Sequence, residues 1–537
     1  MLARDVGKRQ LAAEIAEEEG LELAAKELPA PPRKLARRAG AAHARQGVSS
    51  VLRVRESALF RPVRAIGVVT DNLPLSVQTL GDANFVTVSV GRGFQVFEGD
   101  KLRLAYIGPR LNEKVRGLIN VGDVTITALK SDIVVWHKLT EMGRFRGHRS
   151  SATVMCNIGS SYLVSAAGTE VIVWQLSDIG IEDAGSAAAE SKGAGKSVLA
   201  PLGRLRLGEG FGAVTVVRHP PTYLHKVLIA GSGGQIVLWN VRTREQIHAF
   251  RSHLNTAASG APSGISVTAM LEAPSALDIV AVGFADGRIC MMNVREDKIL
   301  FEFRQAQGRV TSLAFRSGAK ALPHLVSGAP TGDFVVWDLE KRKLHHVHEA
   351  AHRGPISSVH FLPNEPLLLT SGCDNSVKMW IFDTADGFPR YLKGRCGCPG
   401  PARRLSFYGD NDKELLVGGG FEGTGFLSKI SFIQDHQNNE YSQQALDKLT
   451  TAQRAGASNK ERNRLPPVVD VAYCEVRHFD WPAVVTAHDG MEAAMVWSAG
   501  HQALSQTVLL PPPEINGASP VSAVAISSCG SYCVLGL

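Results

Sequence analysis

The sequence has no apolar run that approaches the roughly 18 residues needed to cross a membrane. Its 537 residues are 44% apolar and 20% charged, and they include 53 glycines and 26 prolines. This composition is typical of a globular, turn-rich β protein. We therefore expect no membrane partner, and a chain of this length should form more than one domain. The net charge of +7 permits a polyanionic partner without requiring one.

Clustered cysteines are missing as well. The eight cysteines are scattered, and most lie within apolar, strand-like segments. A disulfide framework would group them at short, regular spacings in a small secreted domain. Cys396 and Cys398 form an isolated C-x-C without a second pair or a nearby histidine, which argues against a zinc site. We interpret all eight as reduced thiols of an intracellular protein.

Signatures of catalysis are also lacking. The stretch Ala194–Ser197 resembles the end of a phosphate-binding loop, but Glu190 stands where that loop requires glycine. No Ser/His/Asp set or carboxylate pair accompanies a cleft signature. The sequence therefore predicts no catalytic residue and no cofactor, and it predicts that the protein is not an enzyme.

Four histidines lie close together in the sequence, at positions 345, 346, 348 and 352. They straddle a loop and the head of a strand unit. We interpret them as one structural histidine beside solvated neighbours, so no metal ligand is expected among them.

The unit from Ala351 to Phe382 shows what the chain is built from. It has a histidine at its head, an apolar strand, a short turn and a closing strand that ends in tryptophan. Its spacing resembles a WD repeat, in which His352, Thr370, Asp374 and Trp380 would form a hydrogen-bonded relay. The buried indole N–H needs an acceptor, which the relay would supply.

The same closing strand pair recurs along the chain, about every 40 to 45 residues, which is the length of one propeller blade. Seven copies precede residue 388, and they begin at Phe85, Val124, Tyr162, Val227, Ile279, His324 and Leu368. Only the seventh contains the whole relay; the third has a family-like head at Gly147-His148 but Gly168 where the aspartate should be. The sequence predicts an all-β fold, with a first WD-repeat β-propeller of seven blades.

Three regions follow from this pattern. We expect residues 1–56 to form a basic, disordered tail. Residues 57–388 should form the first, seven-bladed propeller, and residues 389–537 should form the first blades of a second propeller. An eighth ending begins at Leu415, a ninth closes at Trp497, and a tenth stops in mid-strand at Leu537. We therefore expect the second propeller to be truncated. The polar stretch 434–464 is predicted to be a loop insertion within it.

The basic tail is the better candidate for contact with RNA. Between Leu28 and Glu56 it carries no acidic residue. Its candidate RNA contacts are Arg33, Lys34, Arg37, Arg38 and Arg45. The alternatives are a solvated tail and a nuclear-import signal. The 434–464 stretch is interpreted as an ordinary solvated loop rather than as an RNA contact.

One tetrapeptide suggests a different class of function. Trp239-Asn240-Val241-Arg242 resembles the W-D-x-R ending by which some WD proteins dock the adaptor of a cullin-type ubiquitin ligase. Asparagine stands here where that motif has aspartate. A ligase substrate receptor is therefore the alternative hypothesis.

Several longer stretches resemble one family of WD-repeat proteins, named U three small nucleolar RNA-associated protein 21 or WD repeat-containing protein 36. They are SALFRPVRAIGVVTDNLPLSV (from Ser57), KLRLAYIG (from Lys101), HPPTYLHKVLIAGSGGQIVLWNV (from His219), FRQAQGRVTSLAFR (from Phe303), EPLLLTSGCDNSVKMWIFD (from Glu365), RLPPVVDVAYCEVRHFDW (from Arg464) and VSAVAISSCGSYCVLGL (from Val521). The resemblance covers about Ser57 to Leu537.

The resemblance implies a non-catalytic scaffold subunit of the small-subunit processome that acts in nucleolar pre-rRNA processing. It implies as partners the other WD-propeller subunits of the UTP-B subcomplex, together with U three small nucleolar RNA and pre-rRNA. It also implies that the protein resides in the nucleolus. The family carries two propellers and a helical domain, and the resemblance begins after residue 56.

Overall fold

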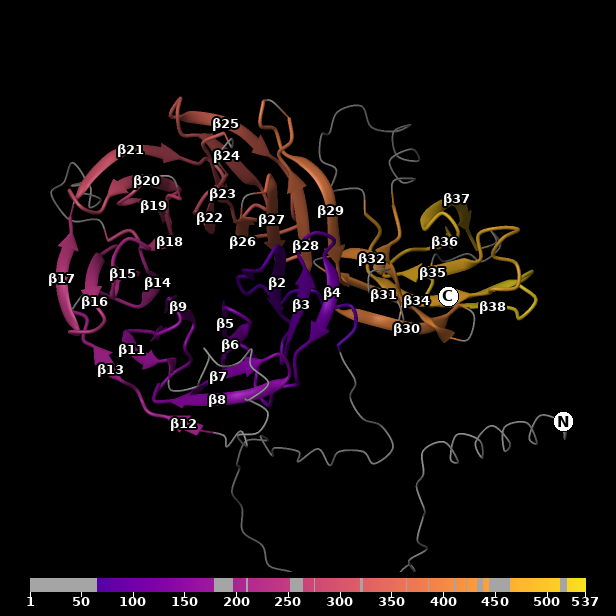
Figure 1. Cartoon of the computed structure of the whole chain (residues 1–537). Coiled ribbons are helices and arrows are strands. Elements are labelled where there is room, and N and C mark those ends of the chain that lie inside the picture. The colour runs from indigo at the N-terminus through magenta and orange to yellow at the C-terminus, as the bar shows by residue number, and fades with distance from the viewer. Residues whose placement is uncertain are drawn as a thin grey trace, which may run out of the picture. The chain divides into compact units, whose positions relative to one another are not determined.

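The computed structural model describes residues 65–177, 197–208, 211–251, 264–274, 276–318, 322–363, 365–384, 386–409, 412–421, 423–431, 438–443, 464–511 and 519–537. All of these residues belong to one compact unit. Every regular element in them is a β-strand, so the predicted all-β fold is confirmed (Figure 1). No described helix is both long and apolar enough to cross a membrane.

From Ser76 to Cys396 the described strands form seven sheets, and four consecutive strands make up most of them. The first three sheets contain β1 (Ser76–Leu80), β2 (Ala83–Ser89), β3 (Phe94–Glu98) and β4 (Arg103–Ile107); β5 (Gly117–Val121), β6 (Val124–Ala128), β7 (Asp132–His137), β8 (Thr140–Arg146) and β12 (Ser197–Leu199); β9 (Val154–Ile158), β10 (Tyr162–Ala167), β11 (Glu170–Gln175) and β13 (Gly203–Leu205). The short strand β12 runs parallel to β8, and every other strand pairing in these three sheets is antiparallel.

The next four sheets are simple antiparallel meanders. They contain β14 (Val214–Arg218), β15 (Lys226–Gly231), β16 (Ile236–Asn240) and β17 (Glu245–Phe250); β18 (Val267–Glu272), β19 (Ile279–Phe284), β20 (Arg288–Asn293) and β21 (Lys298–Arg304); β22 (Ser312–Phe315), β23 (His324–Gly328), β24 (Phe334–Asp338) and β25 (Lys343–His348); β26 (Ile356–Phe361), β27 (Leu367–Gly372), β28 (Ser376–Ile381) and β29 (Arg390–Cys396).

The two middle strands of each sheet explain the apolar runs of the sequence. Strands such as β6 and β24 are buried along their whole length, because neighbouring sheets cover both of their faces. The fourth strands are less buried and more polar: β17 is exposed along most of its length, and no residue of β25 is fully buried. A single sheet of this kind cannot bury its apolar side chains alone, so its stability depends on the sheets beside it.

The seven sheets lie around a common centre, with their first strands innermost (Figure 1). Each sheet contacts the next, and the first and seventh share one apolar cluster that contains Val86 and Phe97 as well as Leu369 and Met379. Hydrogen bonds from the Leu75 amide to Ser358 and from Asn84 to Glu365 join the same two sheets. This arrangement is a closed β-propeller.

The outer strand of the seventh sheet lies beyond the expected domain boundary at residue 388. β29 pairs with β28 from Ser376↔Cys396 to Ile381↔Arg390. Its sequence, RYLKGRC, is largely polar because an outer strand is solvent-exposed on much of its surface. Hydrophobic patterning therefore ends before the sheet does.

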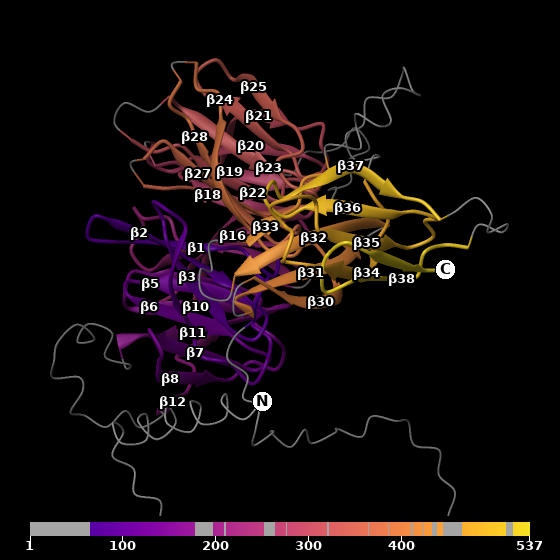
Figure 2. The same ribbon diagram turned by 90° about the vertical axis from the view of Figure 1, so that its right-hand side faces the viewer.

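Three further sheets follow and lie to one side of the seven (Figures 1 and 2). They contain β30 (Ala402–Tyr408), β31 (Glu414–Phe421), β32 (Thr424–Ser431) and β33 (Asn438–Glu440); β34 (Val468–Tyr473), β35 (Val484–His488), β36 (Ala494–Ser498) and β37 (Ala503–Leu509); β38 (Ala523–Ile526) and β39 (Cys533–Gly536). Shared apolar clusters join the eighth sheet to the ninth and the ninth to the tenth.

The predicted loop insertion 434–464 includes part of this framework. Strand β33 completes the eighth sheet by pairing with β32, and Tyr441, which is 1% exposed, lies in the core between the eighth and ninth sheets. The segment Asn-Asn-Glu has no strand propensity, and its pairing with β32 decides its conformation. The prediction of one continuous loop insertion is therefore wrong for these residues.

Candidate functional site

The structure brings together the four residues of the predicted relay in the seventh sheet. His352, from the loop before β26, places Nε2 2.7 Å from the hydroxyl oxygen of Thr370 on β27. Trp380 on β28 donates its indole N–H to the same oxygen at 2.9 Å. The other ring nitrogen of His352, Nδ1, lies 3.0 Å from a carboxylate oxygen of Asp374 in the β27–β28 turn. The side chains of His352 and Asp374 are 0% and 7% exposed, so the relay is closed to solvent.

The carboxylate of Asp374 is held in its charged form. Burial opposes its ionisation, but the hydrogen bond and charge of His352 outweigh burial, with further contributions from Ser376 and Lys378. The pKa of Asp374 is therefore lowered below its usual range. The second carboxylate oxygen accepts a hydrogen bond from the Arg353 amide, which fixes the start of the loop that carries the histidine.

A related relay, missed by the sequence analysis, lies in the third sheet. His148 Nε2 is 2.6 Å from the hydroxyl of Ser165, which also accepts the indole N–H of Trp174 at 2.7 Å. The carboxylate comes from Glu170, whose oxygen lies 3.5 Å from His148 Nδ1, a distance too long for a good hydrogen bond. Glutamate has the longer side chain and approaches the histidine from the first position of β11. Because glycine occupies position 168, where the repeat pattern has aspartate, the pattern does not reveal this relay.

Two further sheets use other polar groups for the same purpose. In the sixth sheet the Trp337 indole donates to Ser327, whose hydroxyl donates in turn to Gln305. In the ninth sheet the Trp497 indole donates to Thr486, which lies 2.8 Å from His488 on the same strand. A buried hydroxyl beside a buried indole is thus the shared feature, and the group behind it varies.

Register explains where the hydroxyl must stand. Thr127, Ser165 and Thr370 each pair across the sheet with the residue two positions before the tryptophan. Both side chains then point to the same face of the sheet. This rule could have identified Thr127 as the acceptor for Trp136, at 2.9 Å, from the sequence alone.

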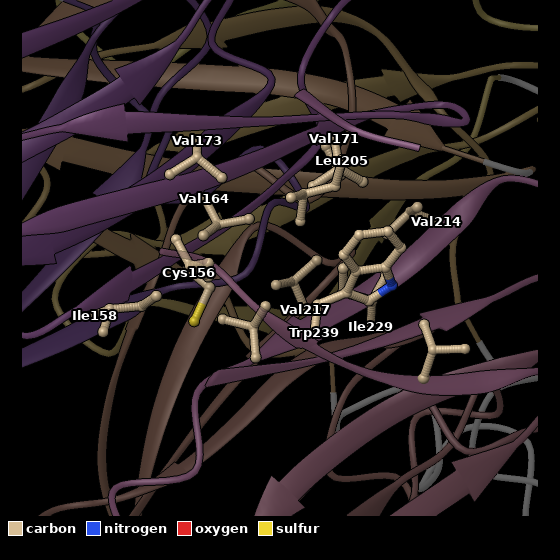
Figure 3. Close-up of a cluster of buried hydrophobic side chains, with 14 of the residues drawn as sticks. Cys156, Ile158, Val164, Val171, Val173, Leu205, Val214, Val217, Ile229 and Trp239 are labelled. Atoms are coloured by element: carbon tan, nitrogen blue, oxygen red, sulfur yellow. The ribbon is translucent and has the colours of Figure 1, made fainter. Parts of the chain in front are cut away.

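Trp239 breaks this rule. Its acceptor position is occupied by Ile229, which pairs with Val237. The indole nitrogen is buried and has no hydrogen-bond partner among the described residues. Figure 3 shows the ring within a wholly apolar cluster between the third and fourth sheets. The fourth sheet is therefore held by apolar packing at this point.

The turn after β16 contains the tetrapeptide that suggested ligase docking. Asn240 accepts hydrogen bonds from the amides of Arg242 and Thr243, as an aspartate would at this position. The substitution of asparagine for aspartate thus preserves the turn, and Arg242 is exposed.

Asn375, the neighbour of Asp374, makes a second set of contacts in the β27–β28 turn. Its side-chain oxygen accepts hydrogen bonds from the amides of Val69 and Thr70, and its nitrogen donates to the carbonyls of Gly67 and Cys398. It therefore joins the segment before β1, the seventh sheet and the chain that leads to the eighth. The predicted RNA contacts Arg33, Lys34, Arg37, Arg38 and Arg45 lie outside the described residues.

The relays resemble catalytic triads in composition but cannot act as such. Ser165 and Thr370 are both 0% exposed. Each hydroxyl oxygen already accepts an indole N–H, which withdraws electron density from it and blocks approach. The arrangement orients and ties strands together, and it offers no access to a substrate.

Several histidines near the centre and within the relays lie where desolvation favours their neutral form; His148 and His488 are buried, and His360 is partly exposed. Burial lowers the pKa of His360 to about 4, and the charge of Arg218 on another innermost strand adds to this effect. Burial also lowers the pKa of His148 and His488. The ordinary pKa of histidine is 6.5. The folded protein therefore binds these protons only at a lower pH than the unfolded chain does. The resulting stability is complete above pH 6.5 and is lost as the pH falls toward 4.

Acidification from pH 7 to pH 5 should therefore destabilise the protein, and His360 alone should contribute about 2 kcal/mol to this loss. Denaturant unfolding at both pH values measures it. His360→Gln should lose less stability on acidification than the unmodified chain, whereas His501→Gln, at an exposed position, should lose as much. An equal pH-dependent loss in all three proteins would contradict the assignment to His360.

A closed ring of mostly four-stranded, antiparallel sheets, with tryptophan–hydroxyl–histidine relays in two of them, defines a WD-repeat β-propeller protein. The family model described as the WDR36/Utp21 first beta-propeller matches residues 86–383, which is more than half of the chain. The chain belongs to the WDR36/Utp21 family, as its longer motifs suggested.

Three curated proteins are similar over about nine-tenths of the chain. U3 small nucleolar RNA-associated protein 21 homolog of Schizosaccharomyces pombe is 30% identical over 91% of this chain and 50% of its own length. WD repeat-containing protein 36 of Homo sapiens is 28% identical over 90% of this chain and 50% of its own length. U3 small nucleolar RNA-associated protein 21 of Saccharomyces cerevisiae is 25% identical over 90% of this chain and 49% of its own length. The chain thus spans about half the length of these relatives.

Two solved structures show weaker likeness. The computationally designed Ika8 protein gives a TM-score of 0.45 at 16% identity, over 70% of this chain and 98% of that one. A chain of the Mitotic Checkpoint Complex gives a TM-score of 0.46 at 15% identity, over 67% of this chain and 99% of that one. No conclusion rests on scores of this size.

Proposed function

We propose that the protein is a non-catalytic scaffold subunit of the small-subunit processome and acts in pre-rRNA processing and small ribosomal subunit biogenesis. The observation that carries the proposal is its family membership, together with relatives named for association with U3 small nucleolar RNA that match about nine-tenths of the chain. Its partners are other WD-propeller subunits of the UTP-B subcomplex, with U three small nucleolar RNA and pre-rRNA, and it resides in the nucleolus.

The closed relays support a role without catalysis. Their hydroxyls, histidines and carboxylates are buried and serve the indole rings, so the polar chemistry of these sheets is used for stability. A propeller built in this way presents rigid rims and faces to partners. Function in such a protein depends on what its surface contacts.

The domain organisation belongs to the same proposal. The first, seven-bladed propeller, expected over residues 57–388, extends through β29 to Cys396. The chain from there to residue 537 supplies the first blades of a second propeller. The tail of residues 1–56 contributes sequence-independent phosphate contacts through Arg33, Lys34, Arg37, Arg38 and Arg45.

Affinity purification of the tagged chain from cells tests the proposal. We expect co-purification of U three small nucleolar RNA and other propeller subunits, and crosslinks to pre-rRNA that decrease when the five basic tail residues become glutamine. The loss should shrink as the salt concentration of the binding buffer rises, because phosphate contacts are screened.

The alternative, a substrate receptor of a cullin-type ubiquitin ligase, makes a different prediction in the same experiment. The observation that favours this alternative is the position of Arg242: it is exposed, and Asn240 preserves the turn that presents it. It predicts co-purification of the ligase adaptor and cullin, lost on Arg242→Ala. Recovery of ligase subunits without nucleolar RNA would overturn the scaffold proposal.

A further inference from the structure

Three potential metal ligands meet at the edge of the sixth sheet. His324 is the first residue of β23, and it pairs directly with Asp338, the last residue of β24. A register shift between Val336 and Trp337 leaves His345 of β25 without a cross-strand partner of its own. One ligand atom from each of the three residues lies within 4.8 Å of the other two.

Two of the three residues are buried, and each of the two imidazoles has one buried nitrogen without a hydrogen-bond partner among the described residues. His324 and Asp338 are 3% and 7% exposed. His324 Nδ1 and His345 Nε2 are both buried, and neither has a hydrogen-bond partner among the described residues. Leaving a buried polar atom without a partner costs free energy, and an ion bound between the two imidazoles would offer such a partner.

The surroundings hold these groups close together. The two imidazole rings stack with their centroids 4.8 Å apart, and the ring of Phe388 lies 5.0 Å from that of His345. Gly387, with φ of 73°, allows the loop before β29 to pass against His324, since a Cβ at this position would lie 2.3 Å from its Cε1. The loop therefore closes one side of the cluster.

Lys341 holds the carboxylate of Asp338 in place, and its Nζ lies 3.6 Å from Oδ2. The Lys341 amide donates to Asp338 Oδ1 at 2.9 Å, and this contact orients the carboxylate from behind.

We propose that His324, Asp338 and His345 bind a Zn²⁺ ion that joins strands β23, β24 and β25. Two imidazoles and one carboxylate are ligands that zinc accepts, at about 2.0 to 2.2 Å. Ligand atoms around tetrahedral zinc are then about 3.3 Å apart, so binding requires them to close in from their present separations. Water would occupy the fourth position. Bound zinc would supply the partner that His324 Nδ1 and His345 Nε2 lack.

The histidines adjacent in sequence could not reveal this cluster. His345 does stand beside His346 and His348, but its partners come from β23 and β24, and only the strand register brings them together. The sequence prediction that these histidines include no metal ligand is revised here for His345 alone.

Zinc titration calorimetry of the tag-free full chain, after chelator treatment, tests the site. We expect one high-affinity Zn²⁺ per chain, weakened at least about tenfold in His345→Gln and in Asp338→Asn. His346→Gln is the matched control, since it changes a neighbouring histidine of the same strand outside the cluster, and it should bind as the unmodified chain does. Equal affinity in all four proteins, or no high-affinity binding, would overturn the proposal.

X-ray absorption of the zinc-loaded unmodified chain gives an answer that does not depend on whether the variants fold. The expected first shell contains only nitrogen and oxygen at about 2.0 to 2.2 Å. A sulfur shell near 2.3 Å would place the ion on cysteines instead, and it would refute this site.

Discussion

Asp374→Ala should lower the free energy of unfolding by about 3 kcal/mol, because it removes a buried carboxylate that is hydrogen-bonded to His352, Ser376 and the Arg353 amide. His352 would keep Ser376 as a partner for Nδ1, at 3.0 Å, which limits the loss. The Arg353 amide would lose its acceptor as well. Urea unfolding at pH 7 measures the change as a lower midpoint with an unchanged slope.

Two variants make this experiment specific. Asp374→Asn keeps an acceptor of the same shape without the charge, so its loss should be smaller than that of alanine. Asp386→Ala changes an exposed aspartate in the loop before β29 and should cost less than about 0.5 kcal/mol. If Asp374→Ala and Asp386→Ala unfold at the same urea concentration, the relay does not stabilise the seventh sheet.

The pH dependence of the Asp374→Ala effect has a defined sign. The folded-state pKa of Asp374 is lowered, so its stabilising contribution is fully present above the unfolded value of 3.8. It is lost as the pH falls from there through the folded pKa. The difference between the two proteins should therefore be constant from pH 7 to pH 5 and shrink only below about pH 4.

The sequence predicted the repeated strand pairs because they are buried on both faces. Apolar pairs such as Leu163–Trp174 and Leu368–Trp380 stand opposite each other in register, and such positions tolerate few polar residues. The seventh relay could be predicted for a related reason. A buried indole needs a hydroxyl, and in that sheet the histidine and aspartate are the family's usual residues.

The remaining features depend on contacts that hydrophobic patterning does not encode. β33 has the polar sequence Asn-Asn-Glu, and its conformation is set by β32. Glu170 replaces an aspartate from a different position because its side chain is longer. His324 and Asp338 meet across two strands, at a distance in sequence that no local motif spans. In each case the deciding partner lies on another strand.

Asn375 should be the most sensitive position of the β27–β28 turn. Its side chain accepts hydrogen bonds from the amides of Val69 and Thr70, at 2.7 and 3.0 Å, and donates to the carbonyls of Gly67 and Cys398. Its φ of 57° lies in the left-handed region, which asparagine tolerates better than alanine. Asn375→Ala should therefore cost about 4 kcal/mol, of which about 3 come from unpaired backbone groups and about 1 from the backbone.

Matched substitutions separate these two causes. Asn375→Gly removes the same hydrogen bonds but accepts the left-handed backbone, so it should cost about 3 kcal/mol. Asn72→Ala is the control for the backbone alone, since Asn72 has φ of 71° and is exposed. It should cost about 1 kcal/mol.

Hydrogen exchange shows where the Asn375 contacts act. In Asn375→Gly, the amides of Val69 and Thr70 should exchange faster, because they lose their acceptor. Peptides from β15 and β16, on the fourth sheet, should exchange as before. Ile66 packs against the eighth sheet, with Val417 and Phe426, so faster exchange should extend to β31 and β32. Faster exchange at residues 66–70 with an unchanged eighth sheet would show that Asn375 closes the ring without linking it to the sheets that follow.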